Sequence, residues 1–324
     1  NHKLVAKIVF FPIFFLILPQ ISIPMVNLPA DFVTETRRMM GDERFRCFLG
    51  AFDEEVPTSI RVNPSRGFSH RLDSSPSHLE NVPWCEEGYY LQDRPQFTFD
   101  PLFHAGCYYV QEASSMFLDE VIRQLAISDW PLAISQKSKA LDLCAAPGGK
   151  STLLRAALPE DCMLYSNEPI RQRANILAEN VEKWGYANHV VTNCYPREYR
   201  KEKMKFDLIL CDVPCSGEGM FRKDEATIRE WSRQNVEKCW QLQREIVSDA
   251  WECLNDGGFL IYSTCTFNTK ENEENIQWIL DNYNAEVWPV NIKPEWNITG
   301  SLLEGFTEPV YRFIPGISRG EGLF

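Results

Sequence analysis

From Lys139 onward the chain alternates short apolar segments with segments of helical periodicity, and this alternation restricts the possible fold more than any other feature. The apolar segments, each predicted to be a strand, are ALDLCA, LYSNE, HVVTN, FDLILCD and GGFLIYSTC. Helices are predicted for STLLRAAL and for residues 170–184, 236–254 and 268–283, the last with Asn268 and Glu271 as a capping pair. Such repetition predicts an α/β fold with a mostly parallel sheet and helices on both faces.

The first half of the chain follows a different pattern. Pro29 opens a predicted helix that runs to about Met40, and a second short helix is predicted for residues 43–52. The segment TSIRVNP alternates like a strand. We therefore predict a small α+β module over residues 25–130, which precedes the α/β domain at residues 131–324.

Residues 1–24 form an apolar extension whose apolar run is interrupted by Pro12 and Pro19. The run is too short to span a bilayer, and no small-residue cleavage site follows it. We expect the native protein to start at Met25 and the extension to lie outside the fold, with no stable membrane partner. The alternative is a genuine membrane anchor.

Composition narrows the class of protein. The 324 residues carry a net charge of −12, which argues against a free-standing nucleic-acid binder but leaves room for an enzyme with a local basic groove. The chain has 11 cysteines without a regular framework, which indicates a reducing compartment, and we expect the cytoplasm. Because no CxxC pair accompanies Cys211 and Cys215, we expect no metal site.

A glycine-rich turn, DLCAAPGGKS, follows the first predicted strand of the α/β domain. Gly148 and Gly149 allow a ligand to approach the backbone, and the next helix offers its N-terminal amides. The turn is not a phosphate-binding loop, because Cys144 stands where that motif needs its first glycine. Glu168 closes the second strand about 20 residues later, where such folds place an acid on a ribose. A nucleotide-type cofactor is favoured over a plain turn with a solvated acid.

Two cysteines, Cys215 and Cys265, lie just beyond the fourth and fifth predicted strands, in DVPCSGEG and YSTCTF. The carboxyl ends of parallel strands can be neighbours, so both thiols and the carboxylate of Asp212 are predicted to border one cavity. This set suggests catalysis by a thiolate nucleophile. Methylation at carbon 5 of cytosine requires such a set, because a thiolate must add to carbon 6 before carbon 5 can attack a methyl group.

Three motifs together, CAAPGGK, DVPCSGEGMFRKD and YSTCTFNTKENEENI, closely resemble the Nop/Sun-type RNA cytosine-5 methyltransferases, within them the bacterial RsmF-type branch that acts on 16S ribosomal RNA. Upstream, SIRVNP, WCEEGYYL and GCYYVQEASSMF resemble the N-terminal module of that family. The resemblance implies a Rossmann-like class I methyltransferase sheet. It also implies S-adenosylmethionine as the cofactor.

The resemblance further implies residue roles. Cys265 would be the nucleophile, Cys215 would assist product release, and Asp212 would bind the cytosine edge and border the cofactor. The cofactor loop would comprise Cys144, Ala145, Ala146, Pro147, Gly148, Gly149 and Lys150. Glu168 would bind the ribose, and Lys150 would also face the active site.

Two features depart from the family pattern. The third strand ends in TNCYP where the family carries an acid near the adenine, so Asn193 would take its place or the contact would be lost. The final GEGLF resembles the start of a last strand that is often followed by an RNA-binding domain, and we expect the methyltransferase domain to be truncated there.

Three basic residues are candidate RNA contacts. Arg222 and Lys223 follow the Pro-Cys loop directly, and Arg61 lies in SIRVNP. Phosphate contacts leave little trace in sequence, so the alternative is that these side chains are simply solvated.

The leading hypothesis is a monomeric S-adenosylmethionine-dependent RNA cytosine-5 methyltransferase that acts on ribosomal RNA or the small ribosomal subunit. One alternative is the same chemistry on tRNA. The other is a non-catalytic RNA-binding or ribosome assembly factor, which the presence of both cysteines and Asp212 disfavours.

Overall fold

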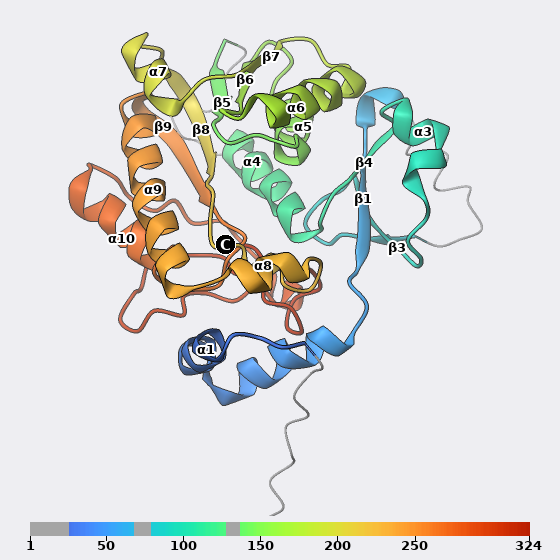
Figure 1. Cartoon of the computed structure of the whole chain (residues 1–324). Coiled ribbons are helices and arrows are strands. Elements are labelled where there is room, and N and C mark those ends of the chain that lie inside the picture. The colour runs from blue at the N-terminus through green and yellow to red at the C-terminus, as the bar shows by residue number, and fades with distance from the viewer. Residues whose placement is uncertain (1–25, 68–78, 128–136) are drawn as a thin grey trace, which may run out of the picture.

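The computed structural model describes residues 26–67, 79–127 and 137–324. The apolar extension and the predicted domain boundary at 130/131 lie outside the described residues. The described chain forms a five-stranded sheet between two helical layers, a small four-stranded sheet at its side, and a helix beneath it (Figure 1).

The larger sheet is parallel throughout, with strand order β7-β6-β5-β8-β9. Its strands are β5 (Lys139–Asp142), β6 (Met163–Asn167), β7 (His189–Thr192), β8 (Phe206–Asp212) and β9 (Leu254–Ser263). All five coincide with the strands predicted from the apolar segments. The α/β class and the parallel sheet are therefore confirmed.

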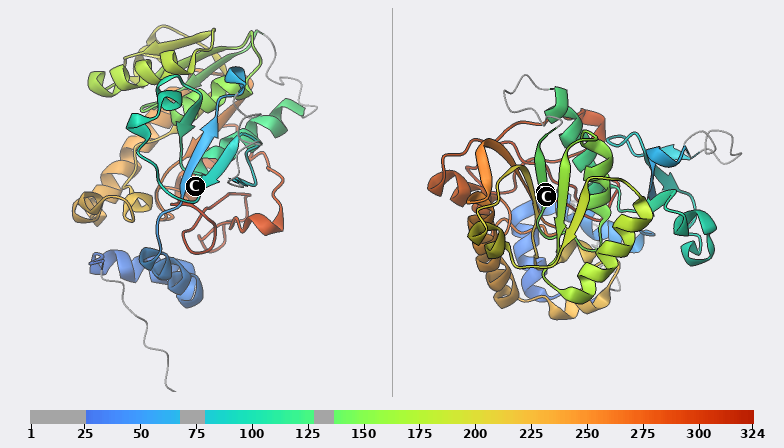
Figure 2. Two further views of the ribbon diagram at one scale, coloured as in Figure 1. Left: turned by 90° about the vertical axis from the view of Figure 1, so that its right-hand side faces the viewer. Right: turned by 90° about the horizontal axis from the view of Figure 1, so that it is seen from above.

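Helices cover both faces of this sheet, as the view from above shows (Figure 2). They are α4 (Phe117–Ile127), α5 (Gly149–Ala157), α6 (Arg171–Trp184), α7 (Pro196–Lys201), α9 (Arg233–Trp251) and α10 (Glu273–Asn282). Residues of α4 and α5 share one core with the sheet, and residues of α7 and α9 share another. Helix α6 packs beside α5, and α10 packs beside α9.

Strand β8 explains why the sheet is buried on both sides. Leu208 and Leu210 belong to the core on the α4–α5 face, whereas Ile209 and Cys211 belong to the core on the α7–α9 face. Side chains alternate between the two faces of a strand, so a strand covered on both faces must be apolar at every position. Each fully buried aliphatic side chain contributes roughly 1.5–3 kcal/mol to folding.

Helices α7, α9 and α10 differ from expectation. Helix α7 was not predicted, and Pro196 at its first position starts it. Helix α9 begins earlier than predicted because Ser232 caps it, with Oγ accepting from the Asn235 N–H at 3.1 Å. Helix α10 begins at Glu273, since the backbone of Asn272 is not helical (φ −110°, ψ −98°). Asn268 and Glu271 do hydrogen-bond each other, but in the turn before the helix.

The smaller sheet is antiparallel, with order β2-β3-β1-β4. Its strands are β1 (Thr58–Val62), β2 (Glu80–Asn81), β3 (Gly88–Leu91) and β4 (Tyr108–Val110), and α3 (Pro101–His104) precedes the last. Short 3-10 helices are η1 (Ala51–Asp53), η2 (Pro64–Arg66), η3 (Phe97–Phe99), η4 (Ser114–Met116), η5 (Glu218–Met220) and η6 (Pro294–Trp296). The predicted strand in TSIRVNP is confirmed as β1.

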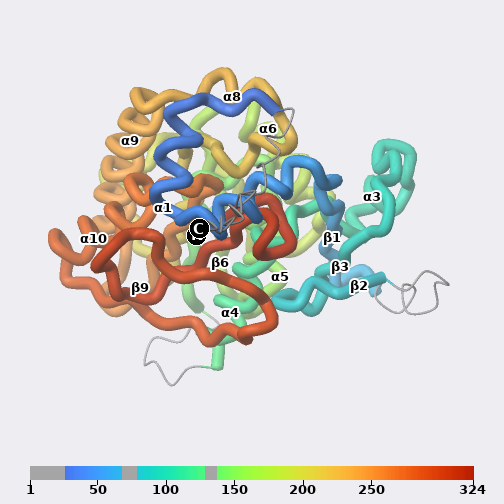
Figure 3. The backbone as a smooth tube through the Cα atoms, turned by 90° about the horizontal axis from the view of Figure 1, so that it is seen from below, coloured from blue at the N-terminus to red at the C-terminus, as the bar shows by residue number. Residues whose placement is uncertain are grey.

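Helix α1 (Ala30–Gly50) bends at Gly41, whose φ of +78° is not helical, and the two parts correspond to the two predicted helices. It packs against the segments that follow β8 and β9. Phe32 contacts Phe221 and Trp231, and Phe48 contacts Phe267. Seen from below, α1 lies across this face near α8 (Glu225–Glu230) and the C-terminal end (Figure 3). Thus α1 covers the carboxyl-end loops of β8 and β9 instead of forming a core with the small sheet.

The segment after α10 returns to the same region. Phe324 and Thr264 exchange backbone hydrogen bonds of 2.9 and 3.2 Å, and Phe313 pairs with Leu323. Arg312 is 1% exposed and forms a buried ion pair with Glu273, with Nε donating to Oε1 at 2.8 Å. Within the described ranges, none of the helices has the length and apolar character needed to cross a membrane.

Replacing Arg312 by Met should destabilise the protein by about 3–5 kcal/mol, because it leaves the Glu273 carboxylate buried without its counter-ion and with the Leu302 N–H as a remaining donor. The measurement is the free energy of unfolding in urea. Arg233→Met is the matched control, since its partner Glu35 is 42% exposed and surface pairs contribute less than about 1 kcal/mol. Equal losses in the two variants would contradict the assignment.

Candidate active site

The carboxyl ends of β5, β6, β8 and β9 meet below the sheet, and the loops that follow them carry the predicted site residues (Figure 1). The loop after β5 contains a cis Ala146–Pro147 peptide bond and leads into α5 at Gly149. Gly148 has a φ of +114°, and an added Cβ would lie 3.2 Å from Leu177. Glycine is therefore needed at position 148 for this turn.

Lys150 and Asp212 form an ion pair beneath the sheet, with Nζ 2.9 Å from Oδ2. Ser263, which faces Asp212 across the β8–β9 ladder, donates to Oδ1 at 2.6 Å. Burial alone would lower the pKa of Lys150, but the charge and hydrogen bond of Asp212 outweigh burial and raise it. Lys150 is therefore cationic at neutral pH.

The two predicted catalytic thiols face each other, with Cys215 Sγ 3.2 Å from Cys265 Sγ. Both side chains are half-buried. The hydrogen bond to Cys265, together with burial, raises the pKa of Cys215 well above its usual range. Cys215 therefore keeps its proton at neutral pH, and its Sγ lies within hydrogen-bond distance of the Cys265 sulfur.

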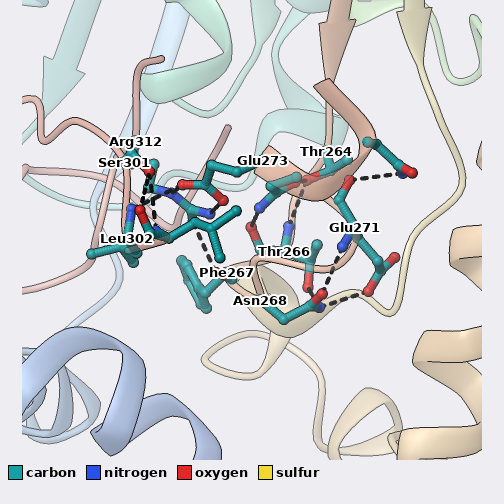
Figure 4. A network of polar contacts seen from close by, with 12 residues as sticks. Thr264, Thr266, Phe267, Asn268, Glu271, Glu273, Ser301, Leu302 and Arg312 are labelled. Carbon is teal, nitrogen blue, oxygen red and sulfur yellow. Dashed lines mark hydrogen bonds and ion pairs between the residues drawn. The ribbon is translucent and has the colours of Figure 1, made fainter. Parts of the chain in front are cut away.

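A buried polar network joins the two cysteine loops. Figure 4 shows its part on the Cys265 side, where Asn268 and Glu271 bond each other and Arg312 reaches Glu273. The Glu271 carboxylate accepts from the Ser216 N–H at 3.0 Å, from Gln243 at 2.7 Å and from Asn268 at 2.7 Å. Ser216 Oγ also lies 2.8 Å from Thr266 Oγ1. These contacts hold the residues that follow the two thiols in one arrangement.

Glu218 and Gly219 complete the junction. The Glu218 carboxylate accepts from the N–H groups of Phe267 and Asn268 at 2.7 and 2.9 Å. The Gly219 N–H donates to the Cys265 carbonyl at 2.7 Å, and a Cβ on Gly219 would lie 2.8 Å from that oxygen. The close backbone approach therefore requires glycine at position 219.

Asp142, which ends β5, was not among the predicted site residues. It is 0% exposed; one oxygen accepts from Ser151 Oγ at 2.6 Å, and the other, Oδ1, has no partner among the described residues. Burial, with a smaller effect from the charge of Asp212, raises its pKa to about 7. The signal was present in the sequence, because Asp142 ends its strand just as Asp212 ends β8.

Glu168 directly follows β6, next to the predicted cofactor loop. One oxygen accepts from the Ile170 N–H at 3.0 Å, and the other pairs with Arg173, whose second terminal nitrogen donates to the Ala146 carbonyl. Arg173 therefore links the predicted ribose-binding acid to the predicted cofactor loop. The exposed side chain of Asn193 donates to the carbonyls of Glu168 and Pro169, so it holds this turn.

The remaining loop residues are positioned by β6. The Ala145 N–H donates to the Asn167 carbonyl at 2.8 Å, and Asn167 Nδ2 donates to the Leu143 carbonyl at 3.1 Å. Cys144 is half-buried beside them, and burial raises the pKa of its thiol well above the usual value. Cys144 therefore stays a neutral thiol.

The structure does not place Arg61 where it could contact RNA. Its side chain is 2% exposed and lies between the small sheet and α5. This corrects the sequence-based expectation, and the reason is that both faces of β1 are buried. Arg222 donates to backbone carbonyls of Glu54 and Gly320, and Lys223 pairs with Glu321, so both tie the Pro-Cys loop to flanking segments.

Two family models match this chain. The family described as 16S rRNA methyltransferase RsmB/F matches residues 130–324, and the N-terminal domain of 16S rRNA methyltransferase RsmF matches residues 28–113. These matches confirm the resemblance inferred from the three motifs.

Curated relatives of this chain support the same family. The ribosomal RNA small subunit methyltransferase F of Pectobacterium atrosepticum is 33% identical over 263 residues, which cover 78% of this chain and 53% of that protein. The protein of the same name from Serratia proteamaculans is 31% identical over 309 residues, which cover 92% of this chain and 62% of that protein. This chain thus spans little more than half the length of the first of these relatives.

Solved structures share the fold. A methyltransferase homolog protein from Pyrococcus horikoshii is 26% identical with a TM-score of 0.69, and the match covers 92% of this chain and 98% of that one. A structure described as NSun6 from Pyrococcus horikoshii with SFG has a TM-score of 0.75 at 19% identity, covering 91% and 96%. The Rossmann-like methyltransferase fold is therefore confirmed.

Asp142→Asn should gain stability relative to wild type as the pH rises from about 4 to 7. The pKa of the Asp142 carboxyl is raised from 3.8 to about 7, so the folded state binds more protons than the unfolded state in this window, and wild-type stability falls with rising pH. The relative gain should reach at most roughly 4 kcal/mol, the value of three pKa units. Urea unfolding at several pH values measures it, with Asp256→Asn, an exposed position near the start of β9, as the control. A constant difference across the window would refute the assignment.

Proposed function

This chain belongs to the 16S rRNA methyltransferase RsmB/F family, and on that basis we propose that it transfers a methyl group from S-adenosylmethionine to carbon 5 of a cytosine in 16S ribosomal RNA. The observation that carries the proposal is the pair of thiols 3.2 Å apart, beside the Lys150–Asp212 ion pair, at the ends of two adjacent parallel strands. We further propose that the enzyme is a cytoplasmic monomer.

The residues present are compatible with the cofactor. Gly148 leaves the turn open to close approach by a ligand, and α5 directs its N-terminal amides toward the carboxyl end of β5. The partnerless Asp142 oxygen lies at the same strand end. The residues that would hold the cofactor are the loop from Cys144 to Lys150, with Glu168 and Asn193 on the neighbouring strand ends. When bound, S-adenosylmethionine supplies an electrophilic methyl group on a positively charged sulfur.

Cys265 would act as the nucleophile. Its thiolate adds to carbon 6 of the cytosine, the carbon 5–carbon 6 double bond opens, and the electron pair moves to carbon 5, which becomes nucleophilic. Asp212, held in place by Lys150 and Ser263, would bind the nitrogen edge of the base and favour this addition.

Cys215 would act in the second half of the reaction. After carbon 5 is methylated, its proton leaves to a base, the double bond reforms and the carbon 6–sulfur bond breaks. The Cys215 thiol, 3.2 Å from the departing sulfur, stabilises the developing thiolate by donating a hydrogen bond. Its raised pKa keeps that proton available at neutral pH.

The substrate base must leave its stack to reach these groups. The chain carries a net charge of −12, so affinity for RNA has to come from local basic groups and from the shape of the site. Since Arg61, Arg222 and Lys223 are engaged within the protein, other residues must supply most phosphate contacts.

The function is tested by incubating the whole chain with S-adenosylmethionine and 16S ribosomal RNA that contains 5-fluorocytosine. Fluorine cannot leave carbon 5 as a proton does, so a covalent protein–RNA adduct through Cys265 is expected. A parallel reaction with 16S ribosomal RNA that contains ordinary cytosine, followed by bisulfite sequencing, would locate the methylated base. Methylation of tRNA in place of 16S RNA would show that the substrate is tRNA. RNA binding without adduct or methylation would indicate a non-catalytic role.

On ordinary RNA, Cys215→Ala should accumulate covalent adduct and lose at least about a hundredfold in turnover, since release lacks its hydrogen-bond donor. Cys265→Ala should form no adduct. Denaturing gel electrophoresis separates the two cases. Cys47→Ala removes an exposed thiol elsewhere and should behave as wild type. Absence of adduct in both catalytic-cysteine variants would mean that the roles are wrongly assigned.

A further inference from the structure

Arg61 is the most completely buried cation of the small sheet. It lies on β1, is 2% exposed, and its Cζ stacks 4.5 Å from the centre of the Trp184 ring at the end of α6. Burial lowers the pKa of its guanidinium to about 10, so the group stays charged at neutral pH. Burying a charge is costly unless its partners are well placed, so the contacts of Arg61 are informative.

Those contacts lead to the start of α5. Arg61 Nε donates to Gln111 Oε1 at 2.8 Å, within the small-sheet module. On the other side, one terminal nitrogen donates to Thr152 Oγ1 at 2.7 Å and to the Gly149 carbonyl at 3.3 Å. Thr152 Oγ1 also donates to the Gly149 carbonyl at 3.1 Å. The guanidinium therefore spans the gap between β1 and the first turn of α5.

The first turn of α5 is also the end of the proposed cofactor loop. Gly149 stands between Gly148, whose positive φ shapes the turn, and Lys150, which pairs with Asp212. A shift of the Gly149 carbonyl would therefore move both neighbours.

We propose that Arg61 is a positioning residue for the cofactor site, and that the small-sheet module is needed for cofactor affinity as well as for any contact with RNA. The planar guanidinium donates in two directions at once, toward Gln111 and toward α5. A lysine ammonium is a compact charge on a flexible stem and does not span the two partners in the same way. The proposal rests on the proposed function only in naming S-adenosylmethionine as the ligand.

A purely architectural role would predict a different pattern. Asn63, two residues further along, lies at the same interface and donates to the carbonyls of Gly106 and Trp184 at 2.9 Å each. It joins the module to α6 without contacting α5. If Arg61 only stabilised the interface between the small-sheet module and the α/β domain, loss of Asn63 would change cofactor affinity and stability in the same way as loss of Arg61.

The experiment measures the dissociation constant of S-adenosylhomocysteine by isothermal titration calorimetry, with the melting temperature of each variant. Arg61→Lys and Arg61→Met should weaken binding about tenfold. In methylation assays the KM for S-adenosylmethionine should rise by a similar factor, while the KM for RNA stays within about twofold. Thr152→Val, which removes only the hydroxyl partner on α5, should weaken binding about threefold in a folded protein.

Asn63→Ala is the control. It should lower the melting temperature while leaving the dissociation constant within about twofold of wild type. Folded Arg61→Lys and Thr152→Val proteins with wild-type affinity would overturn the proposal, as would equal loss of affinity in Asn63→Ala. Because binding is measured without RNA, these outcomes are separate from the test of methylation. A wild-type protein that binds no S-adenosylhomocysteine would overturn the proposed function itself.

Discussion

The site depends on the parallel pairing of β8 with β9. Their register places Asp212 opposite Ser263, so the residues that follow each strand emerge side by side. Backbone pairing alone does not determine where two flexible loops come to rest. The buried carboxylates of Glu218 and Glu271 do so, because each accepts hydrogen bonds across the junction and a misplaced loop would leave them buried without partners. The thiols are thus held together by groups that do not react.

Helix α1 and the C-terminal segment, which are distant in the sequence, cover the two cysteine loops from below. Helix α1 covers the two cysteine loops through aromatic contacts of Phe32 and Phe48, and the C-terminal segment pairs with Thr264. The buried ion pair of Arg312 with Glu273 fixes that segment to α10. The small sheet approaches from the side, where Arg61 reaches the start of α5. The parallel sheet therefore carries the reacting groups, while the flanking segments hold the loops in register.

Sequence patterns were reliable where the cause is local. Apolar runs identified all five parallel strands, and the run is clearest in β8, where Leu208 to Cys211 are buried because helices cover both faces. The starts of α9 and α10 were misjudged, since capping depends on backbone geometry at Ser232 and Asn272 that periodicity does not encode. Arg61 was misjudged because a charged residue in a short strand is normally exposed, and only its neighbours Gln111 and Thr152 explain its burial.

By itself, the sequence determined the class of fold, the glycine turn after the first strand and the identity of the two cysteines, because each follows from residue type and spacing within one segment. The tertiary structure decided which of these segments meet. Strand order brought Cys215 to 3.2 Å from Cys265 and set Lys150 against Asp212, and the packing of the small sheet set Arg61 against α5. Such contacts join residues many positions apart, and their energies depend on burial and on partners that only the folded chain supplies.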